Sequence, residues 1–316
     1  MMDRWAPGWD LMGLFPGKML NSKNIPLTED NWTMTIEPQR SLLDLRLGEL
    51  WHYRDLMLLF VRRDFVSVYK QTILGPLWYL IQPLLTTITF TFIFGRIASL
   101  PTDGLPQFLF YMSGTVVWSY FASCLTKTSE TFVQNANLFG KVYFPRLAVP
   151  VSILISNLIT FLIQFAMFLV FVLYFVWRSP DALTGRGTSI QFNWFWIALS
   201  PVLILMMAGL GLGFGIIISS LTTKYRDLRF LVTFGVSLLM YATPVIYPVS
   251  SIPERFQWLI LANPMTPIVE AFRYAFLGAG TVDIKHLLYS FAFMLIVVFL
   301  GSVIFNRVEQ TFMDTV

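Results

Sequence analysis

The chain has 316 residues, of which 56% are hydrophobic and 16% aromatic, while only 13% are charged. Soluble domains usually carry about a quarter charged residues, and the mean hydropathy of this chain is +0.65. A soluble fold of this size would need far more polar surface than the sequence supplies. The composition therefore excludes a soluble globular protein and predicts an integral membrane protein.

The residue inventory indicates neither a metal centre nor a nucleotide-binding loop. The single cysteine, Cys124, excludes a disulfide framework and a cysteine-based metal cluster, and the two histidines, His52 and His286, are far apart in the chain. The run GLFPGKM at 13–19 is one residue too short for a phosphate-binding loop, and Met19 stands where a Ser or Thr would hold Mg²⁺. We therefore expect no metal, no cofactor and no catalytic residue in this chain.

The N-terminal part divides into two regions. Residues 1–40 contain prolines and no sustained hydrophobic period, so we expect a cytoplasmic extension with little regular structure. In the region 41–76, Ser41 and Asp44 resemble a capping box, and apolar side chains mix with arginines over 56–63. A helix with one polar and one apolar side is expected to lie in the cytoplasmic membrane interface. The alternative is a pair of soluble cytoplasmic helices that pack on each other.

Six stretches are long and apolar enough to cross a membrane as helices, which takes about 20 residues each. No Asp, Glu, Lys or Arg lies in the interior of any of them. Charges inside a membrane usually mark proton relays, ion sites or voltage sensors, so their absence argues against an ion-coupled pump or a voltage-gated channel. The expected fold is all-α, with a membrane domain over 77–305 and a cytoplasmic tail over 306–316. The expected spans are 77–96, 107–126, 150–176, 194–219, 230–249 and 286–305.

The distribution of basic residues sets the orientation of these spans. With the N-terminus in the cytoplasm, 16 of the 22 Lys and Arg residues fall on the cytoplasmic side. Cytoplasmic loops carry such an excess of positive charge. The sequence therefore predicts a multi-pass protein of a bacterial cytoplasmic (inner) membrane with both termini in the cytoplasm.

Aromatic residues are dense near the predicted span ends. Their default role is to form belts at the two membrane interfaces. Because aromatic faces also stack on the C–H faces of sugars, some of them are candidates for a substrate pathway. These candidates are Trp78, Tyr79, Trp118 and Tyr120.

Two basic inner loops and one glycine-rich span carry further patterns. The loop 127–149 predicts a short helix starting near Ser129 and Glu130, where a soluble motor could push; the alternative is plain positive-inside topology. Four glycines at 209, 211, 213 and 215 form two overlapping small-xxx-small pairs, which let another helix approach closely. Ligand contact is the alternative for these glycines. The second inner loop, 220–229, is also basic.

The segment 250–285 does not fit a simple loop. It predicts two short apolar helices over 254–262 and 266–277, separated by Asn263 and Pro264. Runs of this length are too short to cross a membrane and indicate a re-entrant or interfacial hairpin on its external side. The alternative is an ordinary packed external loop. Three residues separate Glu270 from Arg273, so these two side chains can pair on one helical face.

At this point four local patterns resemble the permease subunit of the ABC transporters that export bacterial polysaccharides, including O-antigen, capsule and teichoic acid. The resemblance covers about 50–305 and says nothing of 1–40. The patterns are YKQTILGPLW at 69–78 with Pro83, NANLFGKVYFPR at 135–146 with Pro150, YRD at 225–227, and the series PVIYP at 244–248, IPE at 252–254, NPM at 263–265 and EAFRYAFLG at 270–278.

The resemblance implies an amphipathic interface helix, six spans, a coupling helix after the second span and two external gate helices before the sixth. It also implies a homodimer of permeases with two separate cytoplasmic ATPase subunits, which bind the ATP and Mg²⁺. By this resemblance, the residues expected to couple the permease to the ATPase are Ser129, Glu130, Asn135, Asn137, Lys141, Arg146, Tyr225, Arg226 and Asp227. The residues expected to form the external gate are Pro253, Glu254, Trp258, Asn263, Pro264, Glu270 and Arg273.

The expected substrate is a lipid-linked polysaccharide, with no role for nucleic acid. An uncharged, aromatic-rich pathway suits a long polymer, which must slide without being held tightly at any point. Two other functions are open on the sequence alone. One is an exporter of the same fold for a lipid or drug, and the other is a membrane-embedded enzyme such as a glycosyltransferase, with Glu254, Glu270 and Asp283 as its acidic candidates.

Overall fold

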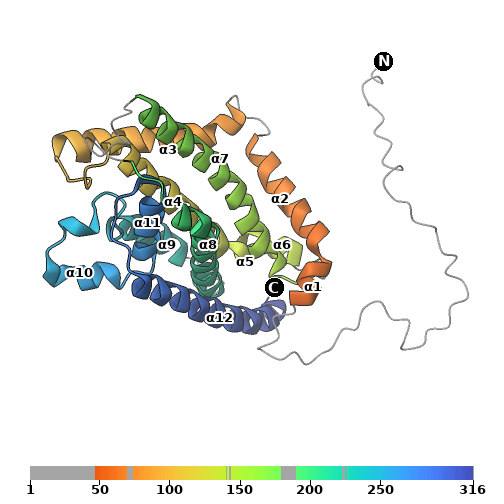
Figure 1. The fold of residues 1–316 in the computed structure, drawn as a ribbon. Coiled ribbons are helices and arrows are strands. Elements are labelled where there is room, and N and C mark those ends of the chain that lie inside the picture. The colour runs from red at the N-terminus through yellow and green to blue at the C-terminus, as the bar shows by residue number, and fades with distance from the viewer. Residues whose placement is uncertain are drawn as a thin grey trace, which may run out of the picture. The chain divides into compact units, whose positions relative to one another are not determined.

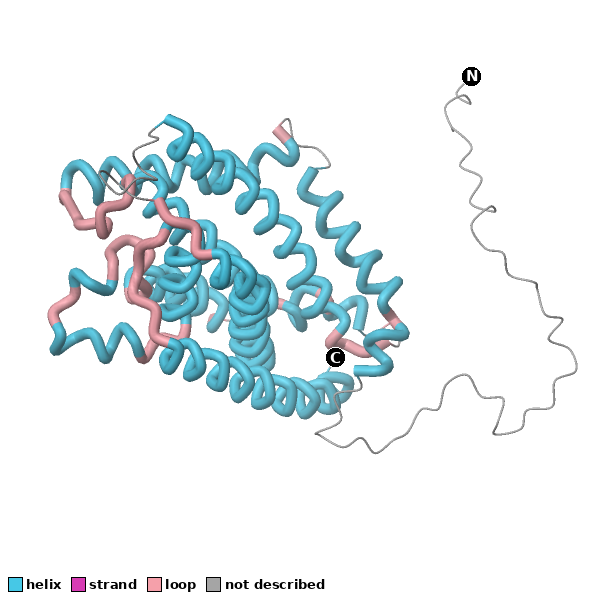
Figure 2. The backbone as a smooth tube through the Cα atoms, viewed as in Figure 1, coloured by secondary structure: helices cyan, strands magenta, loops and turns pink. Residues whose placement is uncertain are grey.

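The computed structural model describes residues 47–69, 74–139, 141, 144–178, 190–222, 225 and 227–315, which form helices and connecting loops with no strand (Figures 1 and 2). The chain divides into two units, 1–41 and 42–316, and every described residue belongs to the second. The expected N-terminal extension and the capping box at Ser41 lie outside the described residues.

Five helical stretches are long and apolar enough to cross a membrane, which confirms an all-α integral membrane fold. The first, Gly75–Ile97, joins the 3-10 turn η4 (Gly75–Leu77), α3 (Trp78–Phe90) and the π-helical η5 (Thr91–Ile97). The others are α4 (Gln107–Ser129), α7 (Ala148–Arg178), α8 (Trp194–Thr222) and the apolar part of α12 (Ile284–Thr315).

The helix in the place of the fifth expected span is shorter than the sequence predicts. This helix, α9 (Leu228–Tyr241), ends eight residues before the expected boundary at 249. Pro244 and Pro248 disfavour helical backbone in the residues before them, and the chain turns there. At 1.5 Å per residue, 14 residues span about 21 Å, against about 30 Å for a bilayer core. The structure therefore establishes five spans by length.

Shorter helices lie at the two ends of this bundle (Figure 1). Because the long helices alternate in direction, three of the short helices share one end of the bundle, here called the α5–α6 end. These are α1 (Leu47–His52), α5 (Thr131–Gln134) and α6 (Ala136–Phe139). The helix α2 (Arg54–Tyr69) leads away from this end. The opposite end, here the hairpin end, carries η7 (Val249–Ser251), α10 (Glu254–Leu261) and α11 (Met265–Leu277). The bounds of α10 and α11 agree closely with the predicted pair of short helices.

The helix α2 packs against the span α7 and buries Met57, Phe60 and Val61, while Arg62 and Arg63 are exposed. Its main partner is therefore a membrane helix. This packing disfavours the alternative of two helices that contact only each other.

The helix α8 lies between α4 and α12, and its glycines make this packing close. A Cβ atom added at Gly211 would lie 2.7 Å from Cys124 Cβ, and one at Gly215 would lie 2.5 Å from Thr128 Cβ, both on α4. On the other side, a Cβ at Gly213 would lie 2.8 Å from Val297 Cγ1 of α12. Real Cβ atoms do not approach so closely, so the predicted packing role of the glycine pairs is confirmed.

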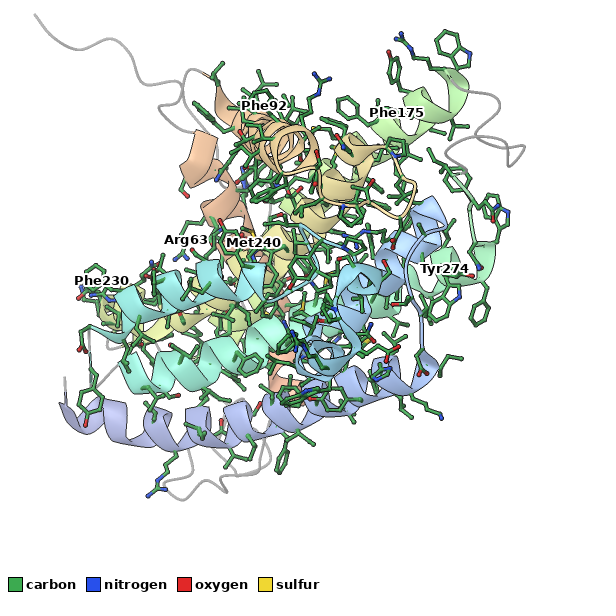
Figure 3. The ribbon with its side chains drawn as sticks, turned by 90° about the vertical axis from the view of Figure 1, so that its left-hand side faces the viewer. Arg63, Phe92, Phe175, Phe230, Met240 and Tyr274 are labelled. Carbon is green, nitrogen blue, oxygen red and sulfur yellow. The ribbon has the colours of Figure 1, made fainter. Side chains whose placement is uncertain are left out.

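Burial differs strongly between the spans. Within the chain, 78% of the α4 span is buried, whereas only 11% of the span Gly75–Ile97 is buried. Large apolar side chains such as Phe92 on that first span and Phe230 on α9 are exposed (Figure 3). The core of the molecule is thus α4, α8 and α11, and the first span and α9 present apolar surface to lipid or to another chain.

Candidate functional site

At the α5–α6 end, the loop after α4 is tied directly to the end of α8. The Thr222 hydroxyl donates to the Ser129 carbonyl oxygen over 3.1 Å, and the Phe132 amide donates to Ser219 Oγ over 3.4 Å. These two hydrogen bonds join segments about ninety residues apart in sequence. The structure thereby brings the two predicted inner loops together.

A buried apolar cluster, here the α5–α6 cluster, extends this connection to the other helices. The Phe132 ring lies 4.7 Å from Phe305 of α12 and 5.9 Å from Phe139 of α6, measured between ring centroids. The Arg146 guanidinium lies 5.6 Å from the centroid of the Phe139 ring. Because α1, α2, α6, α7, α8 and α12 all contribute residues, the cluster joins α5 to most of the bundle. The cluster consists of Leu50, Met57, Phe60, Phe132, Phe139, Phe144, Ala148, Val149, Ile153, Ile216 and Phe305.

The predicted coupling residues divide into an exposed set and an internal set. The exposed residues are Asn137, Lys141, Tyr225 and Asp227, and the half-buried residues are Glu130 and Asn135. Ser129 and Arg146 are buried and act within the fold. Glu130 accepts a hydrogen bond from Gln134, and the Asn135 side-chain amide donates to the Thr131 carbonyl. Arg226 lies outside the described residues.

At the hairpin end, the two short helices have different environments. No residue of α10 is buried, whereas 12 of the 13 residues of α11 are buried. The Phe276 ring lies 5.1 Å from Phe165 of α7 and 6.2 Å from Phe168. The helix α11 is therefore part of the core, and only α10 has the exposed position expected of a hairpin at the outer interface.

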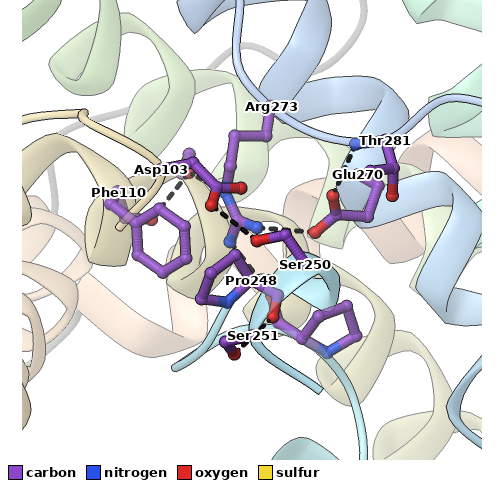
Figure 4. Close-up of polar contacts among 10 residues, drawn as sticks. Asp103, Phe110, Pro248, Ser250, Ser251, Glu270, Arg273 and Thr281 are labelled. Atoms are coloured by element: carbon purple, nitrogen blue, oxygen red, sulfur yellow. Dashed lines mark hydrogen bonds and ion pairs between the residues drawn. The ribbon is translucent and has the colours of Figure 1, made fainter. Parts of the chain in front are cut away.

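A buried ion pair fixes α11 in place (Figure 4). Arg273 Nη1 donates to Glu270 Oε1 over 2.8 Å, as the three-residue spacing predicts. Arg273 Nη2 donates to the Pro244 carbonyl over 3.0 Å, and its guanidinium carbon lies 3.8 Å from the centroid of the Phe110 ring. Arg273 Nε lies 3.4 Å from Ser113 Oγ of α4. Arg273 thus clamps α11 to α4 and to the turn after α9.

Two further hydrogen bonds complete this cluster (Figure 4). The Thr281 amide donates to Glu270 Oε2 over 3.0 Å, and the Ser250 hydroxyl donates to Asp103 Oδ1 over 2.6 Å. Burial raises the pKa of the Glu270 carboxyl, and the nearby Arg273 guanidinium opposes that shift. The cluster therefore connects the loop before α4, the segment after α9, α11 and the segment before α12.

The remaining predicted gate residues lie in α10 and in the turns that flank it. Pro253, Glu254 and Trp258 are exposed, while Asn263 and Pro264 are half-buried. The Asn263 side-chain amide donates to Thr243 Oγ1 over 2.8 Å, and the Met265 amide donates to Asn263 Oδ1 over 3.0 Å. Asn263 thereby fixes the turn between the two helices, and Pro253 begins the exposed helix.

The four aromatic residues expected in a substrate pathway do not share one surface. Trp78 is exposed and Tyr79 is half-buried, but Trp118 and Tyr120 are buried inside the α4 packing. The Tyr120 ring lies 5.0 Å from Phe161 of α7. Trp118 and Tyr120 are therefore enclosed in the packing of this chain, and their role in a substrate pathway stays a prediction.

A groove of about 390 Å³ runs along α3 beside Trp78. The polar side chains that line it are not among the site residues predicted from the sequence. Gln82 and Thr86 follow Trp78 at intervals of four residues, which places all three on one helical face. Thr89 lies one further turn along. This helical spacing can be seen in the sequence. It does not single out these four residues, because they are neither charged nor all aromatic.

Comparisons with known proteins found a matching family model and several similar relatives. The family model described as ABC-2 type transporter matches residues 55–277. An O-antigen export system permease protein RfbA of Klebsiella pneumoniae is 29% identical, over 82% of this chain and 94% of the relative. The RfbA protein of Myxococcus xanthus is 26% identical over 85% of this chain and 98% of the relative. The polysialic acid transport protein KpsM of Escherichia coli is 25% identical over 77% of this chain and 89% of the relative.

Proposed function

This chain belongs to the ABC-2 type transporter family, and we propose that it is the permease through which a lipid-linked polysaccharide is exported across the bacterial cytoplasmic membrane. The observation that carries the proposal is the similarity to O-antigen export permeases over nearly their whole length. A separate ATPase subunit supplies the energy. The chain itself acts as a transporter subunit and not as an enzyme.

The working transporter, in this proposal, contains two copies of the permease and two ATPase subunits. The exposed apolar surfaces of the first span and of α9 support such an assembly, since one protomer leaves them uncovered. We assign α9, together with the buried turn that follows it, as the fifth of six spans. The excess of Lys and Arg supports a cytoplasmic position for both termini and the α5–α6 end.

Energy enters at the α5–α6 end in this mechanism. The ATPase contacts the exposed set Asn137, Lys141, Tyr225 and Asp227. Movement there passes to α8 through the Thr222–Ser129 hydrogen bond and to α2, α7 and α12 through the α5–α6 cluster. Packed helices transmit such shifts because they alternate between discrete arrangements and do not deform continuously.

The exit gate is the second part of the proposal. Because α11 is clamped by Arg273 while α10 has no buried residue, the moving part of the gate is α10 and the turns beside it. The Asn263 turn is the hinge. The helix α11 serves as the fixed support against which α10 opens and closes.

A deletion experiment in the native host tests the function. Removal of the gene should abolish the surface polysaccharide and leave lipid-linked polymer in the cytoplasm, and a plasmid copy should restore export. Polymer should be detected by gel staining of surface and intracellular fractions. Normal surface polysaccharide, with altered export of a lipid or drug instead, would contradict the proposal and favour the other substrate class.

A further inference from the structure

A cavity of about 230 Å³ at the hairpin end is lined by apolar side chains and by a group of polar ones. It lies between the exposed helix α10, the clamped helix α11, the turn η7 and the segment that leads into α12. The side chains that matter are those of Ser250, Gln257, Glu270, Asp283 and His286, together with the segment around Thr281. These groups come from four segments that only the tertiary fold brings together.

The buried wall of the cavity is a carboxylate held in a fixed orientation. Only 2% of the Glu270 side chain is exposed, and its two oxygens bond to Arg273 Nη1 and to the Thr281 amide. Gly280 makes this possible, because its φ of +130° is rarely adopted by other residues and a Cβ there would lie 3.1 Å from Glu270 Oε2. A carboxylate oxygen has lone pairs left after one such bond, so Glu270 still offers acceptors to the cavity.

The rim of the cavity offers both donors and acceptors. His286 Nδ1 lies 3.3 Å from Asp283 Oδ2, and these side chains are 40% and 52% exposed. The Gln257 side-chain nitrogen donates to the Ile252 carbonyl over 3.0 Å, and the Gln257 side-chain oxygen is an acceptor. The Ser250 hydroxyl donates to Asp103, so its oxygen can accept.

The cavity carries no excess of positive charge. Arg273 compensates the charge of Glu270, and the carboxylate of Asp283 lies beside His286, which is charged only when protonated. Without an excess of positive charge the cavity does not favour an anionic ligand. The mixture of fixed acceptors with a few donors instead suits hydroxyl groups, since each hydroxyl donates one hydrogen bond and accepts others.

We infer that this cavity binds a neutral sugar residue at the outer face of the permease. The inference rests on the proposed function, because it places a contact for the polymer beside the exit gate. Among the described residues, no phenylalanine, tyrosine or tryptophan lines the cavity, so hydrogen bonds hold the sugar and the contact is weak. Since α10 forms one wall, an occupied cavity favours one position of the gate.

Ligand binding is measured by saturation-transfer NMR on the intact chain in nanodiscs. One arm uses methyl mannoside, methyl galactoside, methyl rhamnoside and N-acetylglucosamine, and a second arm uses oligosaccharides released from the host's own surface polysaccharide. We expect saturation of at least one neutral sugar. Stronger saturation of the oligosaccharides identifies the exported polymer as the source, and saturation of monosaccharides alone identifies free sugar from the medium.

Substitutions on the cavity wall and beside it decide where the sugar binds. His286→Leu and Gln257→Leu should each reduce the saturation signal at least fivefold. The controls Lys285→Leu and Arg255→Leu change neighbouring exposed residues that do not line the cavity, and they should keep the signal. Elution profiles of all four variants establish that they fold.

The outcomes separate this inference from the proposed function. Absence of saturation in both arms overturns the sugar site, as does saturation that His286→Leu and Gln257→Leu leave unchanged. Binding of a charged probe alone, such as glucuronate or Ca²⁺, also overturns it. None of these results depends on the ATPase or on transport, whereas the gene deletion tests export without reference to this cavity.

Discussion

Arg273 is a fully buried cation whose partners are spread over the chain. Its exposed fraction is 1%, and its guanidinium group contacts Glu270, the Pro244 carbonyl and the Phe110 ring. A buried charge is tolerated only when it is paired and hydrogen-bonded. Spacing along one helix predicts the pairing with Glu270, but the contact to Pro244 joins residues 29 positions apart and needs the tertiary fold.

Removal of this cation should destabilise the protein strongly. Arg273→Met leaves the Glu270 carboxylate buried without its partner, a loss of about 3–5 kcal/mol. The thermal midpoint of the detergent-purified chain, followed by size-exclusion chromatography, should fall sharply. The double variant Glu270→Gln with Arg273→Met should lose less, because no unpaired charge is left. Arg255→Met on the exposed helix is the control, and an equal loss in this control would refute the clamp.

The glycines of α8 provide a second test at this scale. Gly211→Val would force its side chain against Cys124 of α4, and such overpacking costs about 1–3 kcal/mol. Gly235→Val in α9 is a matched control, since nothing lies within 4 Å of a Cβ built there. The fraction of monodisperse protein should drop for Gly211→Val alone. Similar behaviour of both variants would mean that α8 does not depend on close helix approach.

The α5–α6 segment shows how short elements gain a role from their surroundings. Helices of four residues have little stability of their own, since helix formation begins with an unfavourable first turn. The burial of Phe132 and Phe139 among five other elements holds them in place. The positions of the charged residues in the sequence predicted where a partner would bind, while the aromatic packing decides what that partner moves.

Charge reversal in this region should uncouple the transporter. Glu130→Lys and Asp227→Lys add positive charge to two basic loops that face the ATPase in our proposal, and like-charge contacts at an interface cost several kcal/mol. Surface polysaccharide should be lost while the membrane level of the permease stays normal, and less ATPase should co-purify. Glu254→Lys, an exposed reversal at the hairpin end, should retain the ATPase. Normal export by both loop variants would remove these loops from the mechanism.

The two hairpin helices should also differ in chemical accessibility. On a Cys124→Ser background, single cysteines at Phe256 and Leu259 of α10 should react with an impermeant thiol reagent added outside the cell. Cysteines at Ile268 and Phe272 of α11 should be protected, because both positions are buried. Trapping the ATPase with nucleotide should alter labelling of α10 and leave α11 protected. Equal labelling of both helices, unchanged by trapping, would indicate a plain exposed loop.

One chain leaves apolar surface uncovered and encloses some of the predicted pathway residues. The first span is only 11% buried within the chain, and the aromatic residues at Trp118 and Tyr120 are enclosed in its own core. A pathway for a polymer therefore has to be formed with further surfaces, which our proposal assigns to a second copy. The only stretch that resembles a phosphate-binding loop, 13–19, lacks the required spacing.

The purified chain should accordingly show no nucleotide chemistry of its own. We expect no saturable ATP binding and no Mg²⁺-dependent hydrolysis by the permease in nanodiscs, and hydrolysis should begin only when the ATPase subunit is added. Phosphate release and binding of a fluorescent ATP analogue are the measurements. Saturable hydrolysis by the permease alone would overturn the division of labour between two subunits.

The sequence by itself determined five of the spans, since a backbone in lipid must satisfy its hydrogen bonds internally and apolar length then sets the extent of a span. The helix α9 ends before its apolar stretch does. The sequence also predicted α10, α11 and the glycine contacts, because prolines, glycines and short-range spacing act locally. The tertiary structure alone decided that α11 is buried, that Trp118 and Tyr120 lie in the core, and that Ser129 meets Thr222. Lipid tails are as apolar as leucine, so a hydrophobic side chain does not reveal whether it faces lipid or another helix. That choice depends on shape and on hydrogen-bond partners far away in the chain.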